Sequence, residues 1–220
     1  MLRPLMAYSP PQAVQFEVVY RDNDILVFNK PSGLLTVEGK APQHKDCLES
    51  RVRRVWPTAT IVHRLDMATS GLLIMALNKP AHRHISKQFE TRQVSKTYYA
   101  RVLGVPSQKQ GTIELPLICD WPNRPKQMVD HEHGKAACTH WELINNNEES
   151  SLIKLMPVTG RSHQLRVHML SIGHEILGDN LYASDKGKAM SSRLCLHAFN
   201  ISFAHPSSGE SLYFETPYLF

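Results

Sequence analysis

The stretch VHRLDMATSGLLIMAL, Val62 to Leu77, joins two kinds of sequence that seldom stand together. Its second half, from Gly71 on, is apolar throughout, which predicts a central strand buried on both faces. Its first half carries a cation and an anion, Arg64 and Asp66, followed by Thr-Ser-Gly. A buried strand is normally bounded by inert turn residues, so the charged and hydroxyl side chains at this entrance need an explanation.

Arg64 and Asp66 are expected to lie on the same side of the chain. We predict a short strand from Ile61 to Leu65, and side chains two positions apart along a strand share a face. The carboxylate then stands at a strand end beside a cation, which keeps it ionised while shielding it from bulk water. Two interpretations fit, a structural Arg–Asp pair at a sheet edge and a catalytic carboxylate. These residues taken alone favour the structural pair.

Hairpins dominate the rest of the chain, and few helices separate them. Strand patterns that alternate with polar turns are found at 16–30, 61–77, 96–103, 137–157 and 194–215. Helices are predicted over 47–56, after a cap at Asn78, and over 163–171. This order predicts an α+β chain, with α and β elements mixed around a mainly antiparallel sheet.

The positive charge is concentrated around the opening stretch. The 220-residue chain carries a net charge of +5. Residues 51–101 contain ten Lys or Arg and two acids, which gives +8, so the remainder carries −3. This distribution suggests a polyanionic partner such as nucleic acid, although a solvated basic face explains it as well.

The chain is expected to form one domain. Residues 1–15 are predicted to be a flexible leader and residues 16–220 a single domain. The first strand begins near residue 16, so an additional N-terminal RNA-binding domain is not expected. The sequence contains no apolar run of membrane-spanning length and no signal peptide, which predicts a cytoplasmic protein.

Two further segments carry reactive side chains. In KTYYA, Lys96 to Ala100, adjacent tyrosines on a strand face opposite sides, so one can be in the core and the other can line a cleft. In TGRSHQLRVH, Arg161 precedes a predicted helix on which His163 and Arg166 are neighbours. That helix is either an ordinary amphipathic helix with a charged face or a site for phosphate or a carboxylate.

Other kinds of chemistry lack their sequence signatures. The four cysteines form no CxxC pair, which predicts free thiols, and the histidines form no HExxH motif. No glycine-rich phosphate loop, dinucleotide fingerprint or esterase elbow is present. We therefore expect redox-neutral chemistry without a metal or a cofactor.

Taken together, the motifs resemble one family. HRLD followed by ATSG, Asp66 included, resembles the central motif of the RluA family of pseudouridine synthases. NKPSGLL, KTYYA, TGRSHQLRVH and LGD resemble that family's flanking motifs, in the same order. PLICDWPNRPKQ, Pro116 to Gln127, resembles the small members that act on both 23S rRNA and tRNA. The resemblance implies the pseudouridine synthase catalytic fold, with a long, mainly antiparallel sheet, flanking helices, a central cleft and no N-terminal S4 domain.

The resemblance also implies an isomerase that needs no cofactor. The N1–C1′ bond of an RNA uridine breaks, the base turns over, and it re-attaches through C5. Asp66 matches the catalytic aspartate, either as nucleophile at C1′ or as the base that removes the C2′ proton, and both roles require an ionised carboxylate. Arg166 matches the arginine that pairs with this aspartate. Tyr98 matches the active-site tyrosine, which can stack on the base and whose hydroxyl could help to remove the C5 proton; stacking is the favoured role.

Structured RNA is the expected partner, bound by a monomer. A uridine must leave its stack to reach the aspartate, at a cost of a few kcal/mol. Arg64 is the candidate for filling the gap that it leaves. The other predicted RNA-binding residues are His63, Arg83, Lys87, Arg161 and His163. The alternative is a catalytically inactive RNA-binding or ribosome-assembly protein of the same fold, against which the intact Asp66, Tyr98 and Arg166 argue.

Overall fold

The computed structural model describes residues 8–12 and 17–220 of the chain. Most of the predicted leader lies outside these residues. The chain divides into two compact units: unit 1 comprises Met1–Val94 with Ser202–Thr216, and unit 2 comprises Ser95–Ile201 with Pro217–Phe220. The expectation of a single catalytic domain over 16–220 stays a prediction.

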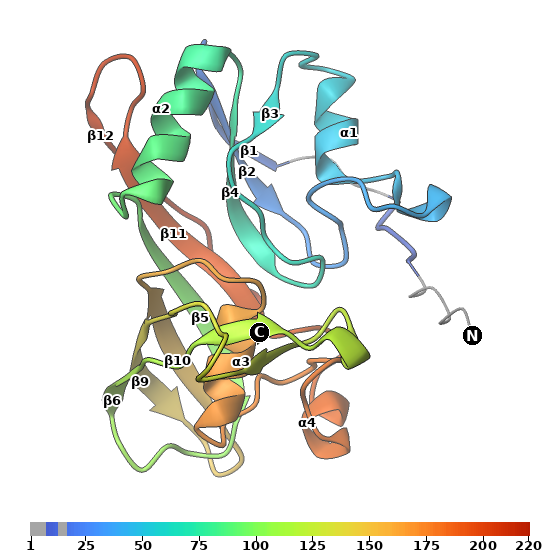
Figure 1. Cartoon of the computed structure of the whole chain (residues 1–220), viewed down its shortest axis with the longest axis vertical. Coiled ribbons are helices and arrows are strands. Elements are labelled where there is room, and N and C mark those ends of the chain that lie inside the picture. The colour runs from blue at the N-terminus through green and yellow to red at the C-terminus, as the bar shows by residue number, and fades with distance from the viewer. Residues whose placement is uncertain (1–7, 13–16) are drawn as a thin grey trace. The chain divides into compact units, whose positions relative to one another are not determined.

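Unit 1 is built on antiparallel strands flanked by helices. Strand β2 pairs with β1 on one side and with β4 on the other, and β3 also pairs with β4. Figure 1 shows α1 and α2 beside these strands. The elements are β1 (Glu17–Arg21), β2 (Ile25–Lys30), η1 (Pro42–His44), α1 (Leu48–Arg53), β3 (Thr60–Ile61), β4 (Ser70–Ala76), α2 (Lys79–Glu90) and β12 (Ser211–Glu215).

Strand β4 and helix α2 form as their sequences predict. Every residue of β4 is buried, as expected for its unbroken apolar run. Asn78 caps α2, since its side chain accepts a hydrogen bond of 2.9 Å from the N–H of Ala81. Ala81 and Ile85 are buried, whereas Arg83 and Lys87 are exposed. The basic side chains of α2 therefore face solvent.

Unit 2 is also built on antiparallel strands. They follow the order β5-β10-β9-β6, beside a separate two-stranded hairpin of β7 and β8. The elements are β5 (Ser95–Leu103), β6 (Gln110–Ile113), β7 (Leu117–Cys119), η2 (Trp121–Asn123), β8 (Gln127–Val129), β9 (Thr139–Asn146), β10 (Ser150–Pro157), α3 (Gln164–Ser171) and α4 (Asp185–Ala189). The chain returns to unit 1 along β11 (Leu196–Ala204).

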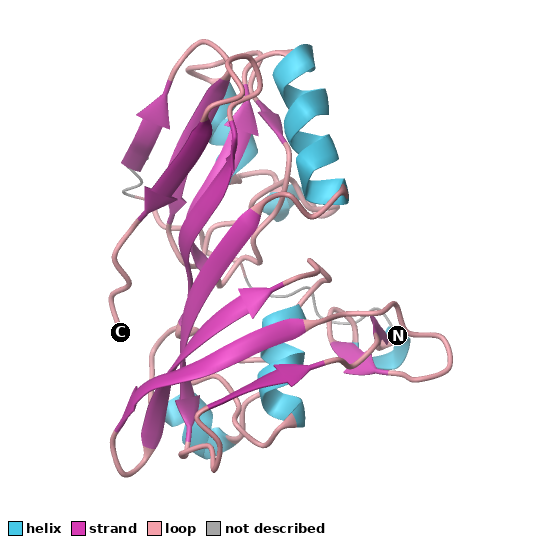
Figure 2. Cartoon of the chain, turned by 90° about the vertical axis from the view of Figure 1, so that its left-hand side faces the viewer, coloured by secondary structure: helices cyan, strands magenta, loops and turns pink. Residues whose placement is uncertain are grey.

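The predicted class is confirmed. The described chain is α+β, with a large, mostly antiparallel sheet and few helices (Figure 2). Helix α4 was not predicted, and the central cleft stays a prediction. The four cysteines are free, as expected. No helix in the described ranges is both long enough and apolar enough to span a bilayer.

Candidate active site

The segment that carries Asp66 is an irregular loop between β3 and β4. The predicted strand over 61–65 is wrong beyond Ile61, where the pairing of β3 with β4 ends. The backbone of Leu65 bonds to a side chain instead of a strand. The Thr36 hydroxyl donates to the carbonyl of Leu65 (2.7 Å), and the same hydroxyl oxygen accepts a hydrogen bond from the N–H of Leu65 (3.3 Å). Arg64 and Asp66 therefore do not share the face of a strand.

The NKPSGLLT segment holds this loop in place. On the far side of Asp66, the carbonyl of Met67 accepts a hydrogen bond from the N–H of Gly33 (2.9 Å). The carbonyl of Ala68 accepts one from the Ser32 hydroxyl (2.7 Å). With the Thr36 contact, the backbone is fixed both before and after the aspartate. From the sequence, NKPSGLL was noted only as one of the motifs that resemble the family's, and its contacts with the aspartate loop were not predicted.

Lys30 adds a charged donor to these contacts. It is fully buried at the end of β2, and its ammonium donates to three backbone carbonyls, those of Pro31 (2.9 Å), Leu34 (2.8 Å) and Met67 (3.1 Å). A buried ammonium is tolerated only where its protons are satisfied. Lys30 thus joins β2, the turn after it and the residue that follows Asp66.

We expect Lys30→Met to destabilise the protein by about 2–4 kcal/mol. The change keeps an aliphatic chain of similar volume but removes the donor from three backbone carbonyls. The Leu34 contact is buried, and a buried acceptor left unsatisfied costs about 1–3 kcal/mol, whereas the Met67 carbonyl keeps its hydrogen bond from Gly33. Urea denaturation measures the free energy of unfolding. Lys45→Met is the matched control, because Lys45 pairs with Glu38 at an exposed site, where ion pairs contribute about 0–1 kcal/mol. Equal stability of the two variants would contradict the prediction.

Asp66 itself begins a tight turn. Its carbonyl accepts a hydrogen bond from the N–H of Thr69 (3.1 Å), and its side chain is half-buried. Arg64 is exposed. His63 is held by structure: its Nε2 accepts a hydrogen bond from the N–H of Ile74 (3.0 Å), and its ring packs against Phe89. The predicted contacts of Arg64 and His63 with RNA stay predictions.

In unit 2 the two adjacent tyrosines separate as predicted. Tyr99 packs against Phe199 and Tyr218, with ring centroids 5.0 and 4.7 Å apart. Tyr98 is half-buried, and alternation along β5 places it on the opposite face, together with Lys96. The tyrosine in the aromatic cluster is therefore Tyr99, which leaves Tyr98 for the face that carries the lysine.

Lys96 is a candidate active-site residue that was not singled out from the sequence. Burial lowers the pKa of its ammonium, because desolvation disfavours the charged form. Its Nζ lies beside the TGRSH segment, since a side chain added at Gly160 would begin 3.8 Å from it. The KTYYA and TGRSHQLRVH motifs are thus neighbours within unit 2.

The TGRSH segment is a fixed loop that leads into α3. The Oε1 atom of Gln164 accepts hydrogen bonds from the Thr159 hydroxyl (2.7 Å) and from the N–H of Arg161 (3.0 Å). The exposed side chain of Arg161 donates to the Ala136 carbonyl (3.1 Å). The helix begins one residue later than predicted, and His163, just before it, has a left-handed backbone with φ 54°.

Helix α3 is buried over Gln164–Met169, and only Leu170 and Ser171 at its end are exposed. The interpretation as an amphipathic helix with a solvent-facing charged side is wrong, because residues 164–169 are all buried. His168 donates from Nε2 to the Leu115 carbonyl (3.1 Å), and its Nδ1 pairs with the Thr139 hydroxyl (2.9 Å). Burial lowers the pKa of His168, so the neutral form occupies this position.

Arg166 is held by a buried carboxylate. Its Nε and one terminal nitrogen donate to the two oxygens of Asp179, each at 2.7 Å, and only 5% and 1% of the two side chains are exposed. Asp179 also accepts a hydrogen bond from the N–H of Leu181 (2.9 Å). A bidentate pair of this kind fixes the plane of the guanidinium. The LGD motif was quoted from the sequence, but no role was predicted for its aspartate.

Tyr182 connects Arg166 with His163. The guanidinium carbon of Arg166 lies 5.1 Å from the centre of the tyrosine ring. The hydroxyl of Tyr182 accepts a hydrogen bond from the N–H of Gln127 (2.7 Å) and lies 2.7 Å from Nδ1 of His163. Because the hydroxyl oxygen accepts from Gln127, its own proton is available for the histidine.

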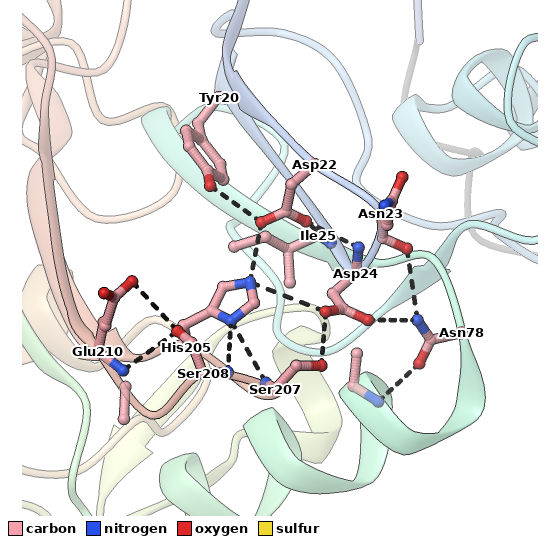
Figure 3. Close-up of polar contacts among 12 residues, drawn as sticks. Tyr20, Asp22, Asn23, Asp24, Ile25, Asn78, His205, Ser207, Ser208 and Glu210 are labelled. Carbon is pink, nitrogen blue, oxygen red and sulfur yellow. Dashed lines mark hydrogen bonds and ion pairs between the residues drawn. The ribbon is translucent and has the colours of Figure 1, made fainter.

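A cluster at one end of unit 1 has the residue types of a metal site but a different role (Figure 3). Within 8–12 and 17–220, possible ligand atoms of Asp22, Asp24 and His205 lie within 4.8 Å of one another. However, Nδ1 of His205 accepts hydrogen bonds from the N–H groups of Ser207 (3.3 Å) and Ser208 (3.1 Å). Nε2 must then carry the proton that it donates to Asp22 (2.8 Å), and a protonated nitrogen cannot bind a metal.

The same cluster keeps Asp22 ionised. Burial raises the pKa of Asp22, but hydrogen bonds from the N–H groups of Ile25 and Asp24 and from the Tyr20 and His205 side chains lower it below its ordinary value. The cluster ties the β1–β2 turn to the segment after β11. Its role is therefore structural.

The chain belongs to the RNA pseudouridylate synthase family. The family's model matches residues 24–171, a span that begins before β2 and ends with α3. It includes the Asp66 loop, both tyrosines and Arg166. Members of this family are isomerases, and the chain is accordingly an RNA pseudouridine synthase.

Several curated relatives share about half of the residues of this chain. The dual-specificity RNA pseudouridine synthase RluA of Escherichia coli strain K12 is 51% identical over 211 residues, which cover 96% of each chain. The RluA of Yersinia pestis is 54% identical over 199 residues, 90% of this chain and 97% of the relative. The resemblance noted from the motifs is thus confirmed at the level of the family.

Solved structures agree. The human RNA pseudouridylate synthase domain containing 1 superposes with a TM-score of 0.79 at 30% identity, covering 95% of this chain and 86% of its own. The human RNA pseudouridylate synthase domain containing 4 shares the fold, with a TM-score of 0.75 at 23% identity. The predicted pseudouridine synthase fold is confirmed.

Proposed function

We propose that this chain converts uridine to pseudouridine in two structured RNAs, a 23S rRNA hairpin and a tRNA anticodon stem-loop. The identity of about 50% over almost the whole length to relatives named dual-specificity RNA pseudouridine synthases carries this proposal. The Pro116–Gln127 segment, which resembles the small dual-specificity members, supports it.

Asp66, Tyr98 and Arg166 are proposed as the catalytic set. The N1–C1′ bond breaks and a C5–C1′ bond forms, while the proton on C5 is lost and N1 gains one. Asp66 acts on the ribose as nucleophile or as base, and the fixed backbone on both sides of it supports a role that needs accurate placement. Tyr98 stacks on the base. Arg166 favours the ionised form of the aspartate.

The remaining proposed residues bind RNA. Arg64 fills the gap left by the extruded uridine, and its exposure supports this. The other members of the set are His63, Arg83, Lys87, Arg161 and His163. The exposed cations among them give sequence-independent attraction to phosphates. Both units are proposed to belong to one catalytic domain, which works as a monomer in the cytoplasm, where these RNAs are found, without a metal or a cofactor.

Tritium release from RNA labelled at C5 of uridine tests this proposal. We expect both stem-loops to release tritium and to keep their length and mass apart from the exchanged label. EDTA is expected to have no effect. Hairpins of the same stem with a scrambled loop are the control. Release from neither stem-loop would contradict the proposal, and release from one alone would contradict dual specificity. Fragmented RNA would indicate a nuclease.

A further inference from the structure

The hairpin of β7 and β8 presents an exposed tryptophan at its tip. Trp121 is 65% exposed, whereas Trp141 is buried and Trp56 is partly buried. A single exposed apolar residue is unremarkable by itself. Its neighbours give the tip its chemical character.

The segment around Trp121 is basic. Trp121 to Gln127 contains two cations and no acid. The guanidinium carbon of Arg124 lies 4.5 Å from the centre of the tryptophan ring. Asp120, the acid just before this segment, caps the short helix η2. Its two carboxylate oxygens accept hydrogen bonds from the N–H (3.3 Å) and the side-chain amide (2.9 Å) of Asn123. Arg124 is exposed beside the aromatic ring, whereas Lys126 is half-buried, with its ammonium 5.9 Å from the centre of the Tyr182 ring.

The tip is held by its own hydrogen bonds. Asp120 and Lys126 are joined by an N–H···O bond of 3.0 Å, and the N–H of Lys126 donates within the same loop to the carbonyl of Asn123 (3.0 Å). These bonds order the backbone that carries Trp121. A pre-formed surface loses less entropy when a ligand binds.

The base of the hairpin is anchored on the helix that carries Arg166. Leu117 of β7 packs with Val167 of α3, and Val129 and Tyr182 pack against them. The N–H of Gln127 at the start of β8 donates to the Tyr182 hydroxyl (2.7 Å). The hairpin is thus anchored at one end and exposed at the other.

We propose that this tip is an RNA-binding element. An unpaired base of the substrate stacks on Trp121, and Arg124 and Lys126 contact the phosphates on either side. An exposed π-face beside cations suits a base and its phosphates. A protein partner would require a wider apolar surface than a single tryptophan. The inference rests on the proposed function for the identity of the RNA and deepens it by naming a contact for an unpaired loop base.

The test measures binding of a fluorescently labelled anticodon stem-loop by anisotropy. We expect Trp121→Ala to raise Kd about tenfold, the loss typical of one base–aromatic stack, and Trp121→Phe to raise it less. Tyr213→Ala is the control, since Tyr213 is a 57% exposed aromatic residue on β12. Arg124→Gln is expected to reduce the slope of log Kd against log salt by about 1.

Tryptophan fluorescence gives a second readout. We expect RNA to quench the emission of the wild-type protein and to quench that of Trp121→Phe much less, since Trp141 is buried and Trp56 partly buried. Thermal unfolding confirms that each variant is folded.

The outcomes separate the inference from the function. If Trp121→Ala binds RNA as tightly as the wild type while tritium release is normal, the inference is overturned and the proposed function stands. If the wild type releases no tritium yet the variants lose affinity in the expected order, the inference stands and the catalytic proposal fails.

Discussion

Asp66→Asn is expected to abolish pseudouridine formation and to leave RNA binding nearly unchanged. Asparagine has the size of aspartate but cannot attack C1′, and it is too weak a base to remove the C2′ proton. Loss of a catalytic base alone costs about 10²–10⁴ in rate, and loss of a nucleophile costs at least as much. Single-turnover tritium release measures the rate, and anisotropy measures Kd.

The control for Asp66→Asn is the same substitution at an exposed position. Asp185 in α4 has a fully exposed side chain and an ion pair with Lys188 at 3.8 Å, which contributes little. Asp185→Asn should therefore keep wild-type rate and affinity. A rate for Asp66→Asn within tenfold of the wild type would contradict both proposed roles of the carboxylate. A large rise in Kd would point to a role in binding instead.

Elements whose folding depends on local pattern could be predicted from the sequence. The apolar run at Gly71 gave β4, and Asn78 gave the start of α2. The two tyrosines of KTYYA faced opposite sides because alternation along a strand is fixed by backbone geometry. In each case the residues that decide the structure are close together in the sequence.

The loop at Asp66 could not be predicted in this way. Its backbone is fixed by Thr36 and Lys30, which lie 29 and 37 residues away from the groups that they bond. A short run ending in Leu65 has the pattern of a strand, and nothing within it shows that its hydrogen bonds go to side chains. The resemblance to a family therefore identified the aspartate, whereas residue patterns alone favoured a structural pair.

Helix α3 shows the same limit for a charged residue. An arginine and a histidine on a helix normally indicate a solvated face. Here Arg166 is buried because Asp179, 13 residues later, neutralises it, and His168 is buried because Thr139 and Leu115 satisfy its ring. Partners distant in sequence thus allow both side chains to be buried.

Asp179→Asn is expected to destabilise the protein by about 3 kcal/mol and to lower kcat. The substitution keeps the size of the side chain but removes its negative charge. Arg166 donates two hydrogen bonds to this carboxylate, and both side chains are buried. Breaking a buried ion pair on one side costs about 3–5 kcal/mol, because the remaining charge loses its compensation. Urea denaturation gives the free energy, and the rate is measured well below the Tm of the variant.

The effect on kcat separates a positioning role for Asp179 from a merely structural one. Ser151→Ala is the matched control, since Ser151 is fully buried in β10 of the same unit and donates to the Gly104 carbonyl (2.7 Å). Loss of this hydrogen bond lowers the stability of the protein but leaves the contacts of Arg166 unchanged, so kcat should be retained. Arg166→Gln should lower kcat at least as much as Asp179→Asn, with little further loss when the two are combined, since both remove one guanidinium–carboxylate arrangement. Normal kcat in folded Asp179→Asn would show that the bidentate bond stabilises unit 2 but does not orient the arginine for catalysis.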